Sequence, residues 1–208
     1  MNQKHQEDLA HIRSMMERSS RFISLSGLSG VFAGLSALIG GLYVYQLFKI
    51  NGVDYFAEGD YVGVYTVPSK LVSELVVTGI VILVCAFVFG LAFTIRKSKK
   101  YNLPIWTSAT KKMLFNLAIP LTVGGVFCLS LLYHQNYGLV APATLLFYGL
   151  ALINAEKYTF SDIKYLGYCQ LFLGCVSLFF IGYGLVFWII GFGILHILYG
   201  LIMFRKYK

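Results

Sequence analysis

Two polar side chains near the end of the chain could do chemistry, although both lie in strongly apolar runs. His196 lies within GYGLVFWIIGFGILHILYG (182–200), and Gln170 lies in the run that begins at residue 165. An imidazole can carry a proton or bind a metal near neutral pH, and an amide can hydrogen-bond to it. A contact between the two would either fix the register of two helices or form a protonatable site.

Glycines flank both polar residues at the same spacing. One glycine precedes each polar residue by three positions and another follows it by four, so each trio shares one helix face. Small residues let two helices approach closely inside lipid. We therefore expect the two glycine faces to meet. The four glycines are Gly167 and Gly174 around Gln170, and Gly193 and Gly200 around His196.

Gln170 and His196 are expected at similar depths in the membrane, which would allow them to contact each other. At the helical rise, Gln170 lies about 9 Å from Lys164 and His196 about 13 Å from Arg205. We expect an interhelical hydrogen bond between His196 and Gln170, direct or through water. A structural role is favoured over a proton pathway, because no Asp, Glu, Lys or Arg lies deep in any apolar run.

The elements that carry these residues are apolar runs of membrane-spanning length. The chain has 208 residues, of which 58% are hydrophobic and 12% charged, far from a soluble domain. About 20 apolar residues cross a bilayer. The sequence predicts an all-α polytopic membrane protein with six spans and a turn at 182–184. The spans are 22–48, 71–95, 114–133, 139–155, 165–182 and 185–204.

The distribution of positive charge predicts the orientation. In a six-span arrangement, 15 of the 17 Lys and Arg residues fall on one side, and only Lys49 and Lys70 fall on the other. Positive loops stay in the cytoplasm, so both termini are expected there. The net charge of +8 is explained by topology and does not indicate nucleic-acid binding.

Three segments are expected at the cytoplasmic surface. Residues 1–21 read as a basic amphipathic arm, residues 205–208 as a basic tail, and the loop after the second span as a cluster of cations with an aromatic anchor. Anionic lipids are the expected partner of these segments. The surface residues are Arg13, Arg18, Arg21, Lys97, Lys99, Lys100 and Trp106.

The first span carries small residues every four positions, a pattern typical of tight helix packing. The partner could lie in the same chain or in another copy, so self-association stays open. The two rows are Ser26, Gly30 and Gly34, and Ala33, Ala37 and Gly41.

A short repeat suggests how the spans are organised. The fourth and sixth spans each open with YGLV, at 137–140 and 183–186, and each carries a second YGL. The repeat favours three hairpins of the same sense.

The sequence contains no signature of a known enzyme class. HExxH, GxSxG, a P-loop and a strand-linked GxGxxG are absent from the sequence. Bis-histidine haem ligation is disfavoured because His134 and His196 lie at opposite depths. We expect no metal and no cofactor.

The chain as a whole resembles small uncharacterised six-helix inner-membrane proteins of bacteria, including those built as three hairpins. The resemblance rests on hydropathy, the glycine pattern and the segments MMERSSRF (15–22) and LHILYG (195–200). It implies a multi-pass protein of the inner (plasma) membrane. The favoured function is non-enzymatic, as a regulatory or accessory subunit that acts through helix association, including with itself. A small transporter or channel with a site at His196 and Gln170 is the first alternative, and a membrane enzyme or haem protein the second.

Overall fold

The computed structural model describes residues 26–53, 68–102 and 104–207. The predicted arm at 1–21, with Arg13, Arg18 and Arg21, lies outside these residues. Within them the fold is entirely helical. The long helices are α2 (Gly27–Ile50), α3 (Ser69–Lys100), α4 (Ser108–Tyr133), α5 (Val140–Ala155), α6 (Ile163–Phe179) and a continuous last helix made of α7 (Gly184–Trp188), the π-helical segment η4 (Ile189–Leu195) and α8 (His196–Lys206). Short 3-10 turns lie at Tyr137–Leu139, Glu156–Tyr158 and Ile181–Tyr183.

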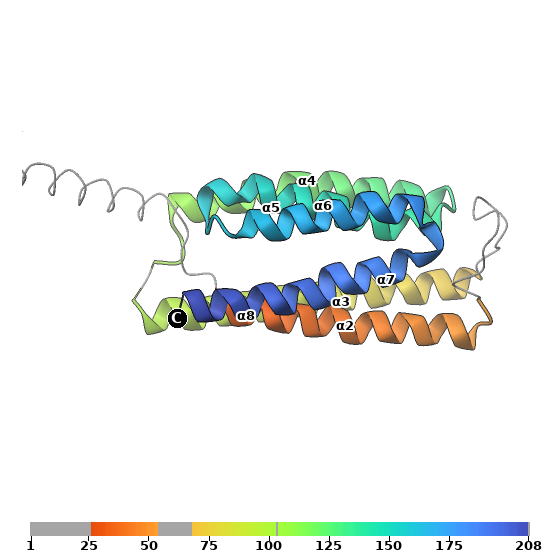
Figure 1. The fold of residues 1–208 in the computed structure, drawn as a ribbon, viewed down its shortest axis with the longest axis horizontal. Helices are drawn as coiled ribbons and strands as arrows, with labels where there is room; N and C mark the ends of the chain where they lie inside the picture. Colours follow the sequence, from red (N-terminus) through yellow and green to blue (C-terminus); the bar gives the residue numbers. More distant parts are fainter. Residues whose placement is uncertain (1–25, 54–67, 103, 208) are drawn as a thin grey trace, which may run out of the picture.

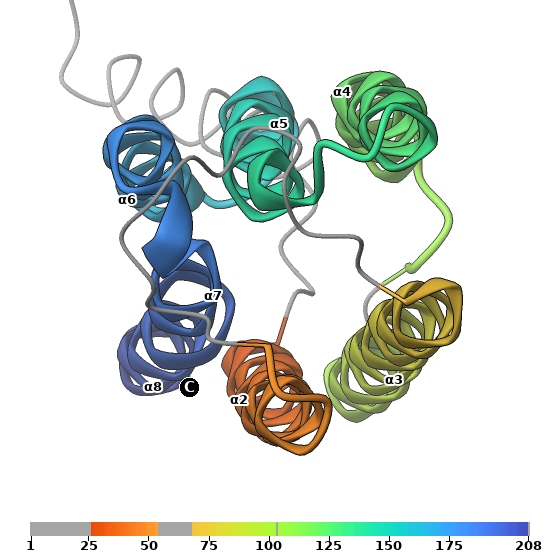
Figure 2. The same cartoon turned by 90° about the vertical axis from the view of Figure 1, so that its right-hand side faces the viewer.

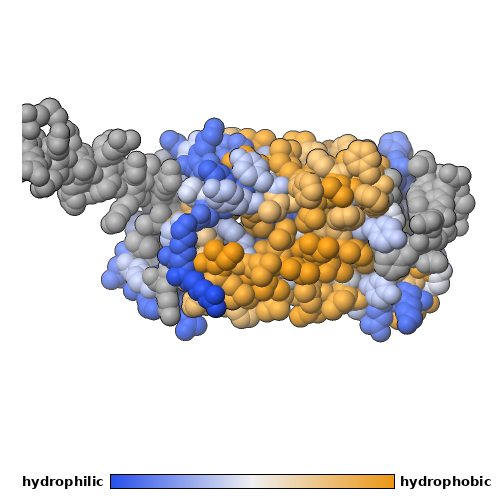
Figure 3. Space-filling model, in the orientation of Figure 1, coloured by the Kyte–Doolittle hydropathy of each residue, from blue (hydrophilic) through white to orange (hydrophobic). Residues whose placement is uncertain are grey.

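Five helical stretches are long and apolar enough to cross a membrane: α2, α3, α4, the last helix, and α5 taken with the 3-10 turns on either side of it (Tyr137–Tyr158, 22 residues). The sixth, α6, is apolar but has only 17 residues, at the lower limit for a span. Figure 3 shows a broad hydrophobic band across the middle of the visible face, with hydrophilic residues toward both ends. The predicted tail is not a separate segment, because Arg205 and Lys206 continue α8.

The start of α4 differs most from the expectation. The sequence predicts a span from residue 114, but the helix begins at Ser108. Thr107 and Thr110 form a capping box, in which each side chain accepts a hydrogen bond from the other residue's backbone N–H. This cap satisfies N–H groups that a helix start otherwise leaves unpaired.

The helices form two layers. Helices α4, α5 and α6 lie side by side in one layer, and α3, α2 and the last helix form the other (Figures 1 and 2). The last helix packs mainly on α2, and α6 mainly on α5. The third hairpin expected from the repeat is therefore not a closely packed pair, because each of its helices has its main contacts elsewhere.

The α3–α4 loop, the α5–α6 connection and the C-terminus lie at the same end of the bundle (Figure 1). Most of the described cations therefore gather at that end. Asp162 accepts hydrogen bonds from Lys206 Nζ at 2.8 and 2.9 Å and from the Tyr207 hydroxyl at 2.7 Å. Lys97 Nζ donates to the Tyr207 carbonyl at 3.1 Å. These bonds link α3, the α5–α6 connection and the end of α8.

Candidate functional site

Four residues from three helices form a polar cluster between the two layers. Tyr148 comes from α5, Gln170 from α6, Gly191 from η4 and His196 from the start of α8. His196 Nε2 lies 2.8 Å from the Tyr148 hydroxyl, and His196 Nδ1 lies 2.9 Å from the Gly191 carbonyl oxygen. Gln170 Nε2 donates to the same carbonyl at 2.8 Å. We call these four residues the polar cluster.

The hydrogen bonds define the tautomer of His196. A carbonyl oxygen can only accept, so Nδ1 must carry the proton that it donates to Gly191. In a neutral ring Nε2 is then the acceptor, and the Tyr148 hydroxyl donates to it. Because Gln170 Nε2 and His196 Nδ1 are both donors, their separation of 3.5 Å is a contact through a shared acceptor. Both ring nitrogens are satisfied without a charge.

Three members of the polar cluster are buried, and Tyr148 is half-buried. Gln170 is 0% exposed and His196 6% exposed. A Cβ atom at Gly191 would lie 2.6 Å from Gln170 Oε1 and 2.5 Å from a methyl group of Leu145. Residue 191 must therefore lack a side chain for Gln170 to reach its carbonyl.

The π-helical segment explains why the Gly191 carbonyl lies beside His196. In π geometry the carbonyl of residue i aligns with residue i+5 instead of i+4. His196 follows Gly191 by five positions, and its own side chain bonds that carbonyl. Nothing in the glycine and aromatic pattern of 189–195 distinguishes a π-helix from an α-helix, so the sequence does not predict this segment.

The structure brings His196 and Gln170 together, but not through the expected glycine faces. Gly167 and Gly174 pack on α5, where a Cβ at Gly167 would lie 3.0 Å from the Gly149 carbonyl oxygen. Gly193 and Gly200 pack on α2. The expectation that the two faces meet is wrong, because α5 and α2 offer small residues of their own.

The glycines among the small residues of the first span have their partner in the same chain. A Cβ at Gly34 would lie 2.7 Å from the Gly193 carbonyl oxygen, and one at Gly30 would lie 3.2 Å from Gly200 Cα. Gly41 faces Ile189. Ala37 is buried and Ala33 half-buried, while Ser26 occupies the N-cap position of α2.

The predicted surface residues lie at the basic end of the bundle. Lys97, Lys99 and Lys100 form the last turn of α3. Lys99 and Lys100 are exposed, and Trp106 in the following loop is 68% exposed. Lys97 is instead half-buried and bonded to Tyr207.

Sequence reasoning missed Tyr148 and Gly191. A signal for Tyr148 existed, since it opens the second YGL of the fourth span, as Tyr199 does in the sixth. In both copies the following glycine lies at a close helix crossing: Gly149 on Gly167, and Gly200 on Gly27. Both tyrosines pack against the same core cluster of Leu152, Ile163 and Leu166.

The polar cluster is held together by hydrogen bonds between neutral groups. Its ring is neutral and fully paired, and no carboxylate contacts it among the bonds of the described residues. Within the same residues, no group of three His, Cys, Asp or Glu side chains could hold a metal. The hydrogen bonds of the polar cluster join α5 and α6 to the last helix.

The chain matches no protein-family model, and it shows no significant similarity to a curated protein or to a solved structure. Its function is therefore inferred from its own residues and their geometry.

Proposed function

We propose that the chain is a six-span protein of the bacterial inner membrane, with both termini in the cytoplasm. Five long apolar helices, the hydrophobic band and the gathering of cations at one end support this proposal. Helix α6, with 17 residues, can serve as the sixth span because it lies within the range of observed lengths. The basic end then faces the cytoplasm and anionic lipid.

We further propose that it acts by helix association, as a regulatory or accessory subunit that also self-associates through α3. The observation that carries this proposal is the exposure of α3. None of the residues in its most apolar 18-residue stretch is buried. Helix α3 packs along α2, and no comparable packing joins it to α4, its other neighbour in the end-on view (Figure 2).

The glycines of α3 also support association through this helix. On α2 each helical glycine meets a neighbouring helix within 4 Å, whereas Gly79 and Gly90 of α3 meet nothing within that distance. They lie eleven residues apart, which places them on one helix face. Exposed glycines on one face allow another helix to approach closely.

The polar cluster supports a scaffold role and not catalysis. Its donors and acceptors join α5 and α6 to the last helix, and the last helix packs on α2. The cluster therefore holds the two layers together while α3 stays available at the edge.

The test is native mass spectrometry of the full chain released from mild detergent. We expect more than one copy, or one copy with a second protein retained. A monomer that carries neither would contradict the association proposal, whatever lipid it retains.

Two observations favour a second candidate function, that of a small transporter. Gln170 Oε1 is buried and has no hydrogen-bond partner among the described residues, and the π-helical segment beside it is of a kind that often occurs at functional sites. A His196→Cys variant without the four native cysteines distinguishes the two functions. Modification by a membrane-impermeant thiol reagent would support a water path, and complete protection would contradict it.

A further inference from the structure

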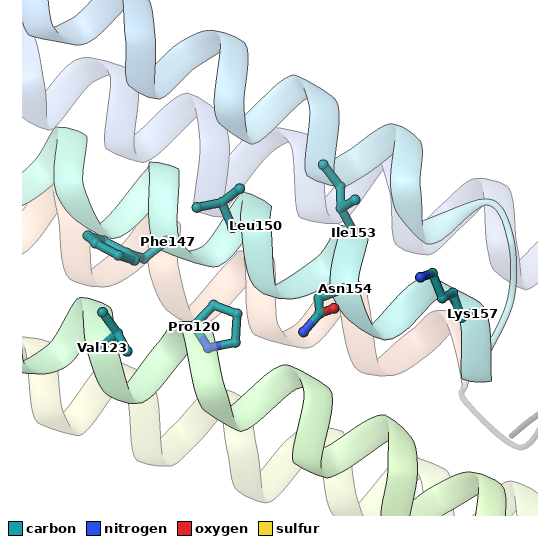
Figure 4. Close-up of a pocket in the computed structure, with 7 residues that line it drawn as sticks. All are labelled: Pro120, Val123, Phe147, Leu150, Ile153, Asn154 and Lys157. Carbon is teal, nitrogen blue, oxygen red and sulfur yellow. The ribbon is translucent and has the colours of Figure 1, made fainter.

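A groove runs between α4 and α5, away from the polar cluster (Figure 4). Its volume is about 490 Å³. The side chains that line most of its length are apolar: Pro120, Val123, Phe147, Leu150 and Ile153.

The backbone carbonyl that Pro120 leaves without a helical donor is already hydrogen-bonded within the protein. Pro120 has no N–H, so the carbonyl of Asn116, four residues earlier, loses its usual helical donor. Asn154 of α5 lines the groove and donates from Nδ2 to that carbonyl at 2.8 Å. The Asn116 side chain bonds back to the Lys112 carbonyl at 2.8 Å. An apolar molecule can therefore occupy the groove without leaving the Asn116 carbonyl unpaired.

The length of the groove matches the hydrocarbon thickness of one bilayer leaflet. From Phe147 to Lys157 the chain rises about 15 Å, which is half of a hydrocarbon core of about 30 Å. At the inner end, Phe147 and Phe127 lie with ring centroids 5.6 Å apart. A lipid chain from one leaflet fits this length, whereas a second transmembrane helix would need a groove about twice as long.

The open end of the groove is basic. Lys157 lines it and is exposed. On α4, Lys112 precedes Asn116 by four residues and Pro120, the nearest α4 residue that lines the groove, by eight. It therefore lies about two helical turns beyond that lining, toward the basic end of the bundle. Two lysines thus lie toward this end of the groove, Lys157 in the 3-10 turn after α5 and Lys112 in the first turns of α4.

We propose that the α4–α5 groove binds one anionic phospholipid, with an acyl chain against Leu150 and the phosphate between Lys112 and Lys157. This site deepens the proposed function, since it rests on the membrane location with the basic end in the cytoplasm. The bound lipid is distinct from the general attraction of the basic surface, because it requires both the apolar groove and the two lysines.

The test uses the full chain in nanodiscs of phosphatidylcholine with a minor fraction of phosphatidylglycerol, followed by native mass spectrometry. We expect one phosphatidylglycerol to stay bound. Retention should fall about 30-fold in Lys112→Ala/Lys157→Ala, because each lysine near the surface adds to the attraction for anionic lipid. A matched control, Lys99→Ala/Lys100→Ala, removes the same charge from the same end of the bundle and should retain the lipid.

A second pair of variants tests the groove itself. Leu150→Trp should fill it and abolish retention, whereas Leu129→Trp, at an exposed position of α4 outside the groove, should not. Equal losses in both lysine pairs, or retention in Leu150→Trp, would overturn the site. Copy number is read from the same spectra, so a failure of the lipid site and a failure of association are separate results.

Discussion

Asn154 of α5 donates a hydrogen bond to the backbone carbonyl of Asn116 in α4 at 2.8 Å, and this is the carbonyl that Pro120 leaves without a helical donor. A side chain of α5 thus supplies the hydrogen-bond donor that the backbone of α4 lacks. The proline can then lie inside a long apolar helix without an orphaned carbonyl, which in an apolar environment is costly.

This relationship predicts a coupling between residues 154 and 120. Asn154→Leu should lower the free energy of unfolding by about 1–3 kcal/mol, because it leaves the Asn116 carbonyl unpaired. In a Pro120→Ala background the restored N–H supplies the bond, so the same substitution should cost much less. Unfolding titrations in mixed detergent micelles measure both. An equal cost in the two backgrounds would contradict the assignment.

The bond between Tyr148 and His196 makes a second prediction. Tyr148→Phe removes the donor to Nε2 and should lower the free energy of unfolding by about 0.6–2 kcal/mol, the range for hydrogen bonds between helices in membranes. Tyr133→Phe is the control, because that side chain is 83% exposed. If the two variants unfold alike, the hydroxyl does not contribute to stability.

Gly191 should tolerate no side chain. Gly191→Ala places a methyl group against Gln170 Oε1 and Leu145 and should destabilise the fold by about 1–3 kcal/mol. Gly125→Ala is the control, since a Cβ there meets nothing within 4 Å and alanine favours the helix. Thermal unfolding of both proteins in one detergent compares them, and a neutral Gly191→Ala would refute the close approach.

The contact of Asp162 with Lys206 predicts a pH dependence. The hydrogen bond from Lys206 lowers the pKa of Asp162 below its usual value. A depressed pKa stabilises the fold above the unfolded value of about 3.9, and this contribution is lost as the pH falls through the folded pKa. Unfolding free energy measured against pH should fall less steeply in acid for Asp162→Asn than for the wild type. Identical profiles would show that the contact adds no stability.

Hydropathy was enough to predict the helices, because an apolar run of about 20 residues has few alternatives to a helix in lipid. It could not predict where α4 begins, since Ser108 is placed by the cap of Thr107 and Thr110, which lies outside the apolar run. The 17-residue length of α6 was also missed, because apolar residues continue past its end.

Helix pairing was less predictable than helix position. Gly167 and Gly193 both mark close contacts, but a glycine indicates only that some helix approaches, and here the two partners are α5 and α2. Within the polar cluster, His196 and Gln170 stood out as polar residues in apolar runs. Tyr148 did not, because tyrosine occurs 15 times in this chain.

The most direct test of the association proposal is energy transfer between copies carrying donor or acceptor fluorophores at the C-terminus, in native membranes. We predict transfer for the wild type and its loss in Gly79→Leu/Gly90→Leu. Val77→Leu/Val88→Leu has the same eleven-residue spacing on the opposite face of α3, and it should keep the signal. Transfer no greater than that of an unrelated monomeric membrane protein, or the same transfer in both double variants, would contradict association through the glycine face of α3.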